Sequence, residues 1–472
     1  MCAPLRGSPP ELETHVHFHR YAASAAAAAA LIAAIPPAEA QTAQDLKSLR
    51  QDVETLRHDY QAKIDDLETR LAKAEAEASA ARKAAEEATA ANAATAKTVD
   101  VLANEPAAPQ AAPATPASAN AFNPGIAAVL NGFAVLAKND PGAAGIAGFA
   151  PGDAIGGPPR GLSLGESEVS FTANIDPTLS GFLDFSIDDG NSISLEEAYI
   201  RTTALPGGFT LKAGRFLSGI GYINERHSHD WSFSDAPLPY KAFLNSQFGD
   251  DGVQVRWLAP TDQFLEFGGE VFRGDSFPAG GAANNGVGAY SAFVHTGADL
   301  GKSASYLAAL SYFHSRSIDR ATAADLFSGD TDLGIASFVY KWAPNGNATT
   351  RNLILSSELF YGEEKGRFDL KPVSQTHFGW YAQGVYQFMP MWSVGLRIAG
   401  LDSEFPGAAL AGSTLDDLGR SPFAASALLE YDTSEFGRLR LQYTRDEAAA
   451  KANDELVLQY TVIYGPHGAH RY

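Results

Sequence analysis

Short runs of alternating apolar and polar residues fill the chain from Phe122 to Tyr472. Residues 438–444 read Arg-Leu-Arg-Leu-Gln-Tyr-Thr, and residues 168–175 alternate in the same way. Successive side chains of a β-strand point to opposite faces, so each run predicts a strand with one apolar and one polar face. We place about sixteen such strands, which begin near residues 126, 162, 178, 193, 209, 251, 262, 288, 304, 332, 351, 375, 391, 422, 436 and 454.

The predicted connections between these strands alternate between long and short. Long connections are expected near 138–161, 216–250, 273–287, 315–331, 362–374, 402–421 and 445–453, with one short exception at 188–192. Short ones are expected at 176–177, 205–208, 259–262, 389–390 and 433–435. Outer-membrane barrels have tight turns on one side and long loops on the other. A soluble sandwich or solenoid is the alternative, but it does not predict this asymmetry.

The sequence therefore predicts an all-β transmembrane barrel of about 16 antiparallel strands over residues 122–472. Closure removes the exposed edges that strands with apolar outer faces would otherwise present. An even number of strands also brings both ends of the barrel to the side of the short turns. That side would face the periplasm of a cell with an outer membrane.

The N-terminal segment has the features of a signal peptide. Residues 22–35 are apolar except for Ser24, they follow Arg20, and they lead to Ala38-Glu39-Ala40. A positive residue, a short apolar stretch and an Ala-x-Ala site predict export and cleavage after residue 40. A polyalanine linker is the alternative interpretation of residues 22–35.

Residues 41–102 predict a periplasmic α-helical coiled coil. Apolar residues recur there at spacings of three and four, and Lys, Arg, Glu, Asp and Gln flank them. A helix with such a narrow apolar stripe is unstable alone, so the pattern predicts a homo-oligomer. A solvated single helix is the alternative. Residues 103–121 are rich in Pro and Ala and predict a semi-extended linker between the coiled coil and the barrel.

Composition narrows the range of functions. Asp and Glu number 55 against 35 Lys and Arg, and the net charge of −20 argues against a nucleic-acid partner. Cys2 is the single cysteine and precedes the expected cleavage site, so neither a disulfide nor a cysteine-bound metal is expected in the mature chain. No Ser/His/acid grouping stands out by spacing, and we expect no enzymatic activity. The expected partners are outer-membrane lipid, further copies of the chain, and small solutes or ions.

The predicted loop 216–250 is the candidate to narrow the lumen. It mixes acids, bases and aromatic residues, which is what a selectivity filter requires. The predicted constriction residues are Glu225, Arg226, Asp230, Trp231, Asp235 and Tyr240. By strand parity, the residues expected to line the lumen are Arg256, Arg397, Arg438, Arg440, Glu168 and Asp184. The arginines would favour anions and the overall acidity cations, so the ion preference stays open. A simpler interpretation is that these residues only keep the interior hydrated.

Two pairs of histidines are candidate metal ligands. His227, His229 and Asp230 offer imidazole and carboxylate groups within one loop, and His467 and His470 form a second pair near the C-terminus. Such ligands suit zinc, which is the one cofactor that the sequence suggests. The alternative is that these are ordinary solvated loop histidines.

Several segments carry a resemblance to a known family. They are residues 227–233, 239–244, 249–262, 459–460 and 465–470. In these segments the chain resembles a proteobacterial family labelled zinc-regulated TonB-dependent outer-membrane receptors. The order of signal peptide, coiled coil and barrel also resembles phosphate-selective porins, which are usually trimeric. The first resemblance implies uptake of zinc or another metal. The second implies a trimeric channel, and general porins fold their third outer loop into the lumen.

Three functions remain in competition. The preferred one is an outer-membrane porin-like channel for small solutes or ions, with a possible link to metals. The second is an energised TonB-dependent receptor, but the heptad helix and the Pro/Ala linker cannot fold as a plug domain. The third is a structural barrel whose periplasmic coiled coil tethers the outer membrane.

Overall fold

The computed structural model describes residues 124–141, 145–187, 192–281, 285–322 and 325–465. The predicted signal peptide, coiled coil and linker lie outside these residues, as do His467 and His470. In the described ranges, no helix has the length and apolar character needed to cross a membrane.

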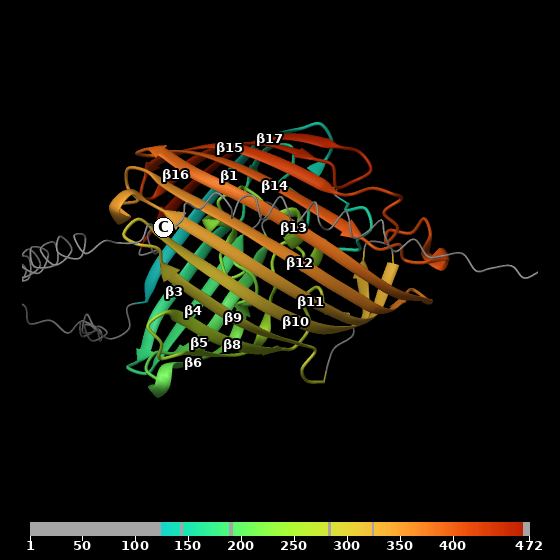
Figure 1. The fold of residues 1–472 in the computed structure, drawn as a ribbon, viewed down its shortest axis with the longest axis horizontal. Helices are drawn as coiled ribbons and strands as arrows, with labels where there is room; N and C mark the ends of the chain where they lie inside the picture. The colour runs from blue at the N-terminus through green and yellow to red at the C-terminus, as the bar shows by residue number, and fades with distance from the viewer. Residues whose placement is uncertain (1–123, 142–144, 188–191, 282–284, 323–324, 466–472) are drawn as a thin grey trace, which may run out of the picture. The chain divides into compact units, whose positions relative to one another are not determined.

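The described residues form one closed antiparallel β-barrel (Figure 1). Each strand pairs with the next along the chain, and the last strand returns to pair with the first. The strands are β1 (Gly125–Ala137), β2 (Gly161–Leu164), β3 (Ser167–Asp176), β4 (Leu179–Ile187), β5 (Ile193–Thr202), β6 (Phe209–Leu217), β7 (Gly249–Leu258), β8 (Phe264–Phe272), β9 (Ala289–Asp299), β10 (Ala304–Thr322), β11 (Asp325–Trp342), β12 (Asn352–Phe368), β13 (Lys371–Met389), β14 (Trp392–Ser403), β15 (Phe423–Ser434), β16 (Gly437–Asp446) and β17 (Asn453–Tyr464).

Strands β2 and β3 together occupy a single position in the barrel. Both pair with β1, and only Gly165 and Glu166 separate them. They act as one strand with an interruption, so the seventeen-stranded sheet closes as a sixteen-position barrel. The prediction of a barrel of about sixteen antiparallel strands is confirmed.

The two faces of the wall have opposite character. On β16, Leu439, Leu441 and Tyr443 are exposed on the outside, whereas Arg438 and Arg440 are buried on the inside. Other strands repeat this arrangement, with large apolar side chains outward and Ser, Thr, Gln, Glu and Arg inward. A water-soluble protein has the reverse pattern, and an apolar exterior around a polar interior is typical of a transmembrane barrel.

The connections differ between the two ends of the barrel. One end, called the turn end, has short turns such as 177–178, 203–208, 259–263 and 390–391, and also holds the start of β1 and the end of β17. The opposite end, called the loop end, holds the connections 138–160, 218–248, 273–288, 404–422 and 447–452. These five long loops agree with the prediction.

Two predicted long loops, 315–331 and 362–374, are wrong. Strands β10 to β13 run through both segments and stay paired as far as Thr322 with Asp325 and Phe368 with Lys371. Apolar side chains of this extension pack on the 404–422 loop, in a cluster of Phe327, Phe368, Val373, Leu410 and Leu415. The extra strand length is therefore stabilised by a folded loop.

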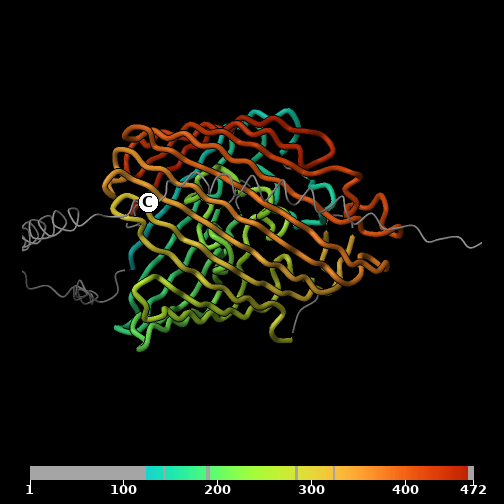
Figure 2. The backbone as a smooth tube through the Cα atoms, in the orientation of Figure 1, coloured from blue at the N-terminus to red at the C-terminus, as the bar shows by residue number. Residues whose placement is uncertain are grey.

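The longest connection enters the barrel. Residues 218–248, which we call the lumen loop, join β6 to β7 and contain the short helix α3 (Leu238–Leu244). In Figure 2 the light-green segment is seen behind the front strands of the wall. Helix α3 has Pro239 in its first turn and ends at Asn245, whose φ of 52° is the left-handed conformation common after helices.

An apolar cluster holds this loop to one side of the wall. Ile220, Leu238, Tyr240 and Leu244 of the loop are buried together with inward side chains of β8 to β14. The wall members include Phe272, Phe313, Phe360, Tyr381 and Leu401. The core of the molecule therefore lies inside the barrel, between the lumen loop and the wall.

Candidate functional site: the lumen loop

Polar contacts fix the lumen loop to widely separated strands. Near its start, Ser218 and the backbone N–H of Gly219 donate to Glu270 of β8, at 2.5 and 2.9 Å. The backbone N–H of Gly221 donates to Ser311 of β10 at 3.2 Å. Further polar contacts reach β3, β5, β12, β14 and β16, so the loop crosses the lumen.

Glu358 of β12 is the anchor on the apolar side. Its carboxylate is fully buried and accepts hydrogen bonds from Tyr240 at 2.8 Å, Tyr381 at 2.6 Å and Ser337 at 2.5 Å. The backbone N–H of Tyr222 donates to it at 2.8 Å. Burial and the neighbouring Glu358 carboxylate hold the pKa of Tyr240 well above its usual value, so this phenol stays a donor.

Asp235 is a second anchor, where the loop meets β14 and β16. It contacts Arg397 of β14 at 2.5 Å, Lys241 of α3 at 2.7 Å and Gln442 of β16 at 2.9 Å. Burial would raise the pKa of Asp235, but the charges of Arg397 and Lys241 outweigh burial and hold the pKa well below its usual value. The loop is therefore tied to β14 and β16 by a charged network.

Arginines of β16 hold the middle of the loop through its backbone. Arg438 donates to the carbonyl oxygen of His229, and Arg440 donates to that of Trp231 at 2.9 Å. Arg440 also pairs with Glu430 of β15 at 2.7 Å. These arginines thus position the loop and already have partners for their charge.

A cluster of two histidines and several carboxylates lies where the loop meets β3, β4 and β5. Glu168 of β3 accepts from both rings, with His229 Nδ1 at 3.0 Å and His227 Nδ1 at 3.3 Å. The other ring nitrogen of His227 lies 3.0 Å from Glu197 of β5. Burial opposes the charged form of His227, but hydrogen bonds and charge from Glu168 and Glu197 outweigh it and raise its pKa.

A β-bulge shapes the acidic wall of this cluster. The register between β4 and β5 shifts after Asp184, so that Glu197 lies opposite Asp184 and Leu195 lies opposite Phe185. Bulges of this kind redirect side chains. Glu196 then bonds Ser186 at 2.6 Å, while Glu197 accepts from the backbone N–H of Leu217 at 3.0 Å.

The structure places most of the residues singled out from sequence in this region, but not as one group. Arg256 turns to Glu225 of the loop and to Glu266 of β8, the latter at 3.2 Å. The guanidinium of Arg226 lies over the ring of Tyr222, 4.6 Å from its centre. The Asp230 carboxylate lies 3.7 Å from Nε2 of His229, the ring nitrogen that does not contact Glu168. Asp230 lies outside the Glu168–His227–His229 group.

Sequence reasoning missed the wall residues that complete these contacts. Glu197 and Glu358 point inward on β5 and β12. The alternation of apolar and polar residues does not distinguish them from the other inward-facing residues. Residues 161–165, Gly-Leu-Ser-Leu-Gly, also match the spacing of a hydrolase nucleophile elbow. In the structure this segment is the extended strand β2 paired with β1, so it does not have the strand-to-helix turn of a nucleophile elbow.

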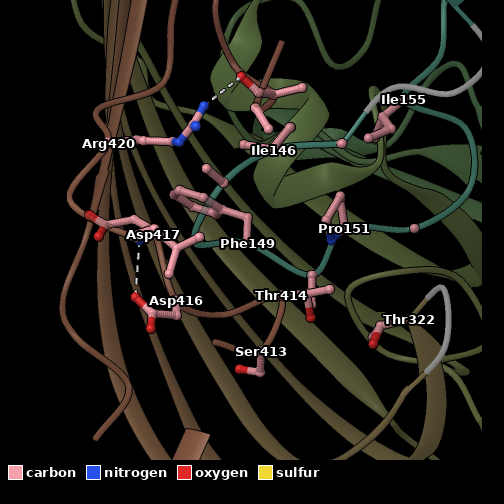
Figure 3. Close-up of a pocket in the computed structure, with 17 residues that line it drawn as sticks. Ile146, Phe149, Pro151, Ile155, Thr322, Ser413, Thr414, Asp416, Asp417 and Arg420 are labelled. Carbon is pink, nitrogen blue, oxygen red and sulfur yellow. Dashed lines mark hydrogen bonds between the residues drawn. The ribbon is translucent and has the colours of Figure 1, made fainter. Parts of the chain in front are cut away.

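Cavities that share lining residues lead from the loop end towards Asp235. The first cavity, of about 310 Å³, is lined by loops 145–152 and 413–420. Asp416, Asp417 and Arg420 lie on one side of it, and Pro151 and Ile155 lie on the other (Figure 3). A second, of about 390 Å³, shares Gly145 with the first and is lined by Asp140, Asp446, Lys451 and Glu455 among others. A third, of about 40 Å³, shares Asp446 and Glu455 with the second and reaches Asp235, Lys241 and Arg397. We call this row of cavities the funnel.

Comparison with known proteins gives distant similarities. No family model matches the chain. An uncharacterized protein of Aquifex aeolicus is 29% identical over 348 residues, which cover 66% of this chain and 70% of the relative.

Among solved structures, the chain is similar to the outer membrane channel DcaP of Acinetobacter baumannii, with 12% identity, a TM-score of 0.48, and coverage of 72% of this chain and 97% of that one. An anion-selective porin from Comamonas acidovorans has 12% identity and a TM-score of 0.46, covering 72% and 99%. The trimer form of OmpT from Vibrio cholerae has 10% identity and a TM-score of 0.47, covering 72% and 99%. Strand pairing and closure, not these similarities, define the barrel.

Proposed function

We propose that the chain is an outer-membrane channel for small solutes or ions, in which the lumen loop narrows the passage. The observation that carries this proposal is the funnel, in which two cavities of about 310 and 390 Å³ near the loop end are followed by one of only about 40 Å³ at Asp235. Charged side chains line it, as passage of hydrated solutes requires.

The outer surface supports a position in a membrane. Aromatic side chains gather at the turn end, where the rings of Phe209 and Trp257 are 6.3 Å apart and those of Trp392 and Tyr431 are 4.7 Å apart. Tyr290 and Tyr312 lie outward on the strands nearer the loop end. Transmembrane barrels carry aromatic girdles of this kind at both interfaces of the apolar band.

The balance of charges in the lumen favours the passage of cations, because the arginines are paired with carboxylates. Arg256, Arg397 and Arg440 each have a carboxylate partner within the described residues. The funnel adds acids that outnumber its basic residues: Asp140, Asp235, Asp416, Asp417, Asp446 and Glu455 against Lys241, Arg397, Arg420 and Lys451. We therefore propose a cation preference, a choice that the sequence left open.

The test is conductance of the full-length protein in a planar lipid bilayer under a KCl gradient. We expect steady conductance steps and a reversal potential of the sign given by cation selectivity. Asp446→Asn combined with Glu455→Gln removes two funnel charges and should move the reversal potential towards zero. Asp262→Asn, in an exposed turn at the turn end, is the matched control and should leave it unchanged.

A second candidate function follows from the apolar packing of the lumen loop. The loop is bound to the wall by the cluster around Tyr240 and Phe360, which favours a closed barrel that serves as a membrane anchor. Absence of conductance from protein that is folded and inserted would overturn the channel and support this anchor. The prediction of an energised receptor depends on residues ahead of the barrel, outside the described part of the chain, and stays a prediction.

A further inference from the structure

The histidine–carboxylate cluster has the geometry of a metal site. One ligand atom each from Glu168, His227 and His229 can be chosen so that all lie within 4.8 Å of one another. Zinc holds nitrogen and oxygen ligands at about 2.0–2.2 Å in a tetrahedron, which places neighbouring ligand atoms about 3.3 Å apart. The observed separations from Glu168 to the two rings, 3.3 and 3.0 Å, are close to that value.

Asp184 provides a second and independent observation. Its side chain is 1% exposed, and within the described residues neither carboxylate oxygen has a hydrogen-bond partner. One of these oxygens lies 3.7 Å from His227 Nδ1, on the same side as Glu168. Buried carboxylates are normally satisfied by hydrogen bonds or by a cation. Asp184 is not a member of the Glu168–His227–His229 group, so its carboxylate would have to move closer to that group to become a fourth ligand.

The surroundings of His227 also fit a metal ligand. Its Nδ1 faces Glu168 and Asp184, while its Nε2 contacts Glu197 at 3.0 Å. Histidines that bind metals usually donate their other ring N–H to a carboxylate, which fixes the ring orientation. Glu197 is itself held by the backbone N–H of Leu217. The ring is thus oriented before any cation binds.

We propose that Glu168, His227 and His229 bind a zinc ion inside the barrel, and that the Asp184 carboxylate moves in as the fourth ligand. Two imidazoles and two carboxylates are a ligand set suited to a borderline divalent cation, and less suited to calcium or magnesium, which prefer oxygen ligands alone. Because His227 and His229 belong to the lumen loop and the two acids to β3 and β4, zinc links the loop to the wall. This proposal stands apart from conduction, since it requires only the loop position.

The test is calorimetric titration of zinc alone into chelator-treated, full-length protein in detergent. We expect about one zinc ion per chain at this site, with calcium and magnesium binding far more weakly. X-ray absorption at the zinc edge should show nitrogen and oxygen neighbours that include two imidazoles. Zinc should also protect the lumen loop from added protease, because a ligand that binds the native state stabilises it.

Matched variants separate this site from other histidines. Asp184→Asn and Glu168→Gln keep side-chain shape and should each weaken zinc binding about ten-fold or more, and His227→Ala with His229→Ala should abolish it. His314→Ala is the control, since His314 also pairs with a carboxylate, Asp332 at 2.9 Å, but lies outside the cluster. His467→Ala with His470→Ala tests the C-terminal pair.

The outcomes are distinct. Unchanged zinc affinity in the folded Asp184→Asn and Glu168→Gln variants would overturn the proposal, as would loss of binding only in the C-terminal variant. No zinc binding by the wild type would mean that the cluster is a hydrogen-bonded ion pair network. Each of these results can be obtained whether or not the barrel conducts.

Discussion

A few buried charged residues hold the lumen loop in place, and Asp235 is one of those with several partners. Arg397 is 5% exposed, and Lys241 of the loop is also largely buried. Asp235→Asn would leave both cations without their carboxylate partner. Breaking a buried ion pair by removing one partner costs about 3–5 kcal/mol. We therefore expect a loss of that order in the free energy of unfolding, measured by urea titration in lipid vesicles.

The pH dependence of this loss has a definite sign. The pKa of Asp235 is lowered in the folded protein, so its contribution to stability is complete above its unfolded pKa of about 4. The contribution disappears only as the pH falls through the lowered folded value. The stability difference between wild type and Asp235→Asn should thus stay constant between about pH 7 and about pH 4 and shrink below that. Asp262→Asn, at an exposed turn, should show no difference at any pH. A difference that grew in acid would contradict this account of Asp235.

The sequence predicted the site residues of the lumen loop better than the site residues of the barrel wall. Acids, bases and aromatic residues concentrated between residues 216 and 250 drew attention to His227, Asp235 and Tyr240. Glu358, the partner of Tyr240, is more than a hundred residues away in sequence, and Glu197, the partner of His227, is thirty residues away. These pairs form only because of how the loop folds back. Sequence adjacency also suggested Asp230 as a metal ligand, whereas the structure brings Glu168 to both imidazoles.

The assignment of an outer, lipid-facing side and an inner side to each strand can be tested directly. Leu441 lies at the middle of β16 and points outward. Leu441→Arg should cost about 2–4 kcal/mol of unfolding free energy in vesicles, because the charge would face the centre of the apolar band. Leu370, at the tip of the β12–β13 hairpin and 90% exposed, is the matched control, and Leu370→Arg should cost little. Equal costs would mean that the outer face of β16 does not contact lipid.

Strand positions were largely predictable because the barrel imposes alternation on every strand. The start of β14 at Trp392 and that of β17 at Asn453 each lie within one residue of the expected position. The errors lie in β11 and β13, which begin earlier than expected, at Asp325 and Lys371. Beyond the apolar band both faces of a strand can be polar, as with Arg316 and Asp330, which form an ion pair at 2.9 Å across two strands. Alternation is then lost, and the segment resembles a loop in sequence.

For the whole molecule, association should depend on the N-terminal segment and not on the barrel. The barrel pairs β1 with β17 and leaves no open edge, so it needs no partner to complete its sheet. The heptad pattern of residues 41–102, in contrast, predicts a helix that requires partners. We expect three copies per particle by light scattering in detergent, and mostly single copies after Leu56→Asn with Leu67→Asn. Lys63→Asn, off the apolar stripe, is the control. If the double variant kept its mass while heating still shifted its gel mobility as for a folded barrel, the contact would have to lie on the outer wall, where Leu162 and Leu164 are exposed beside β1.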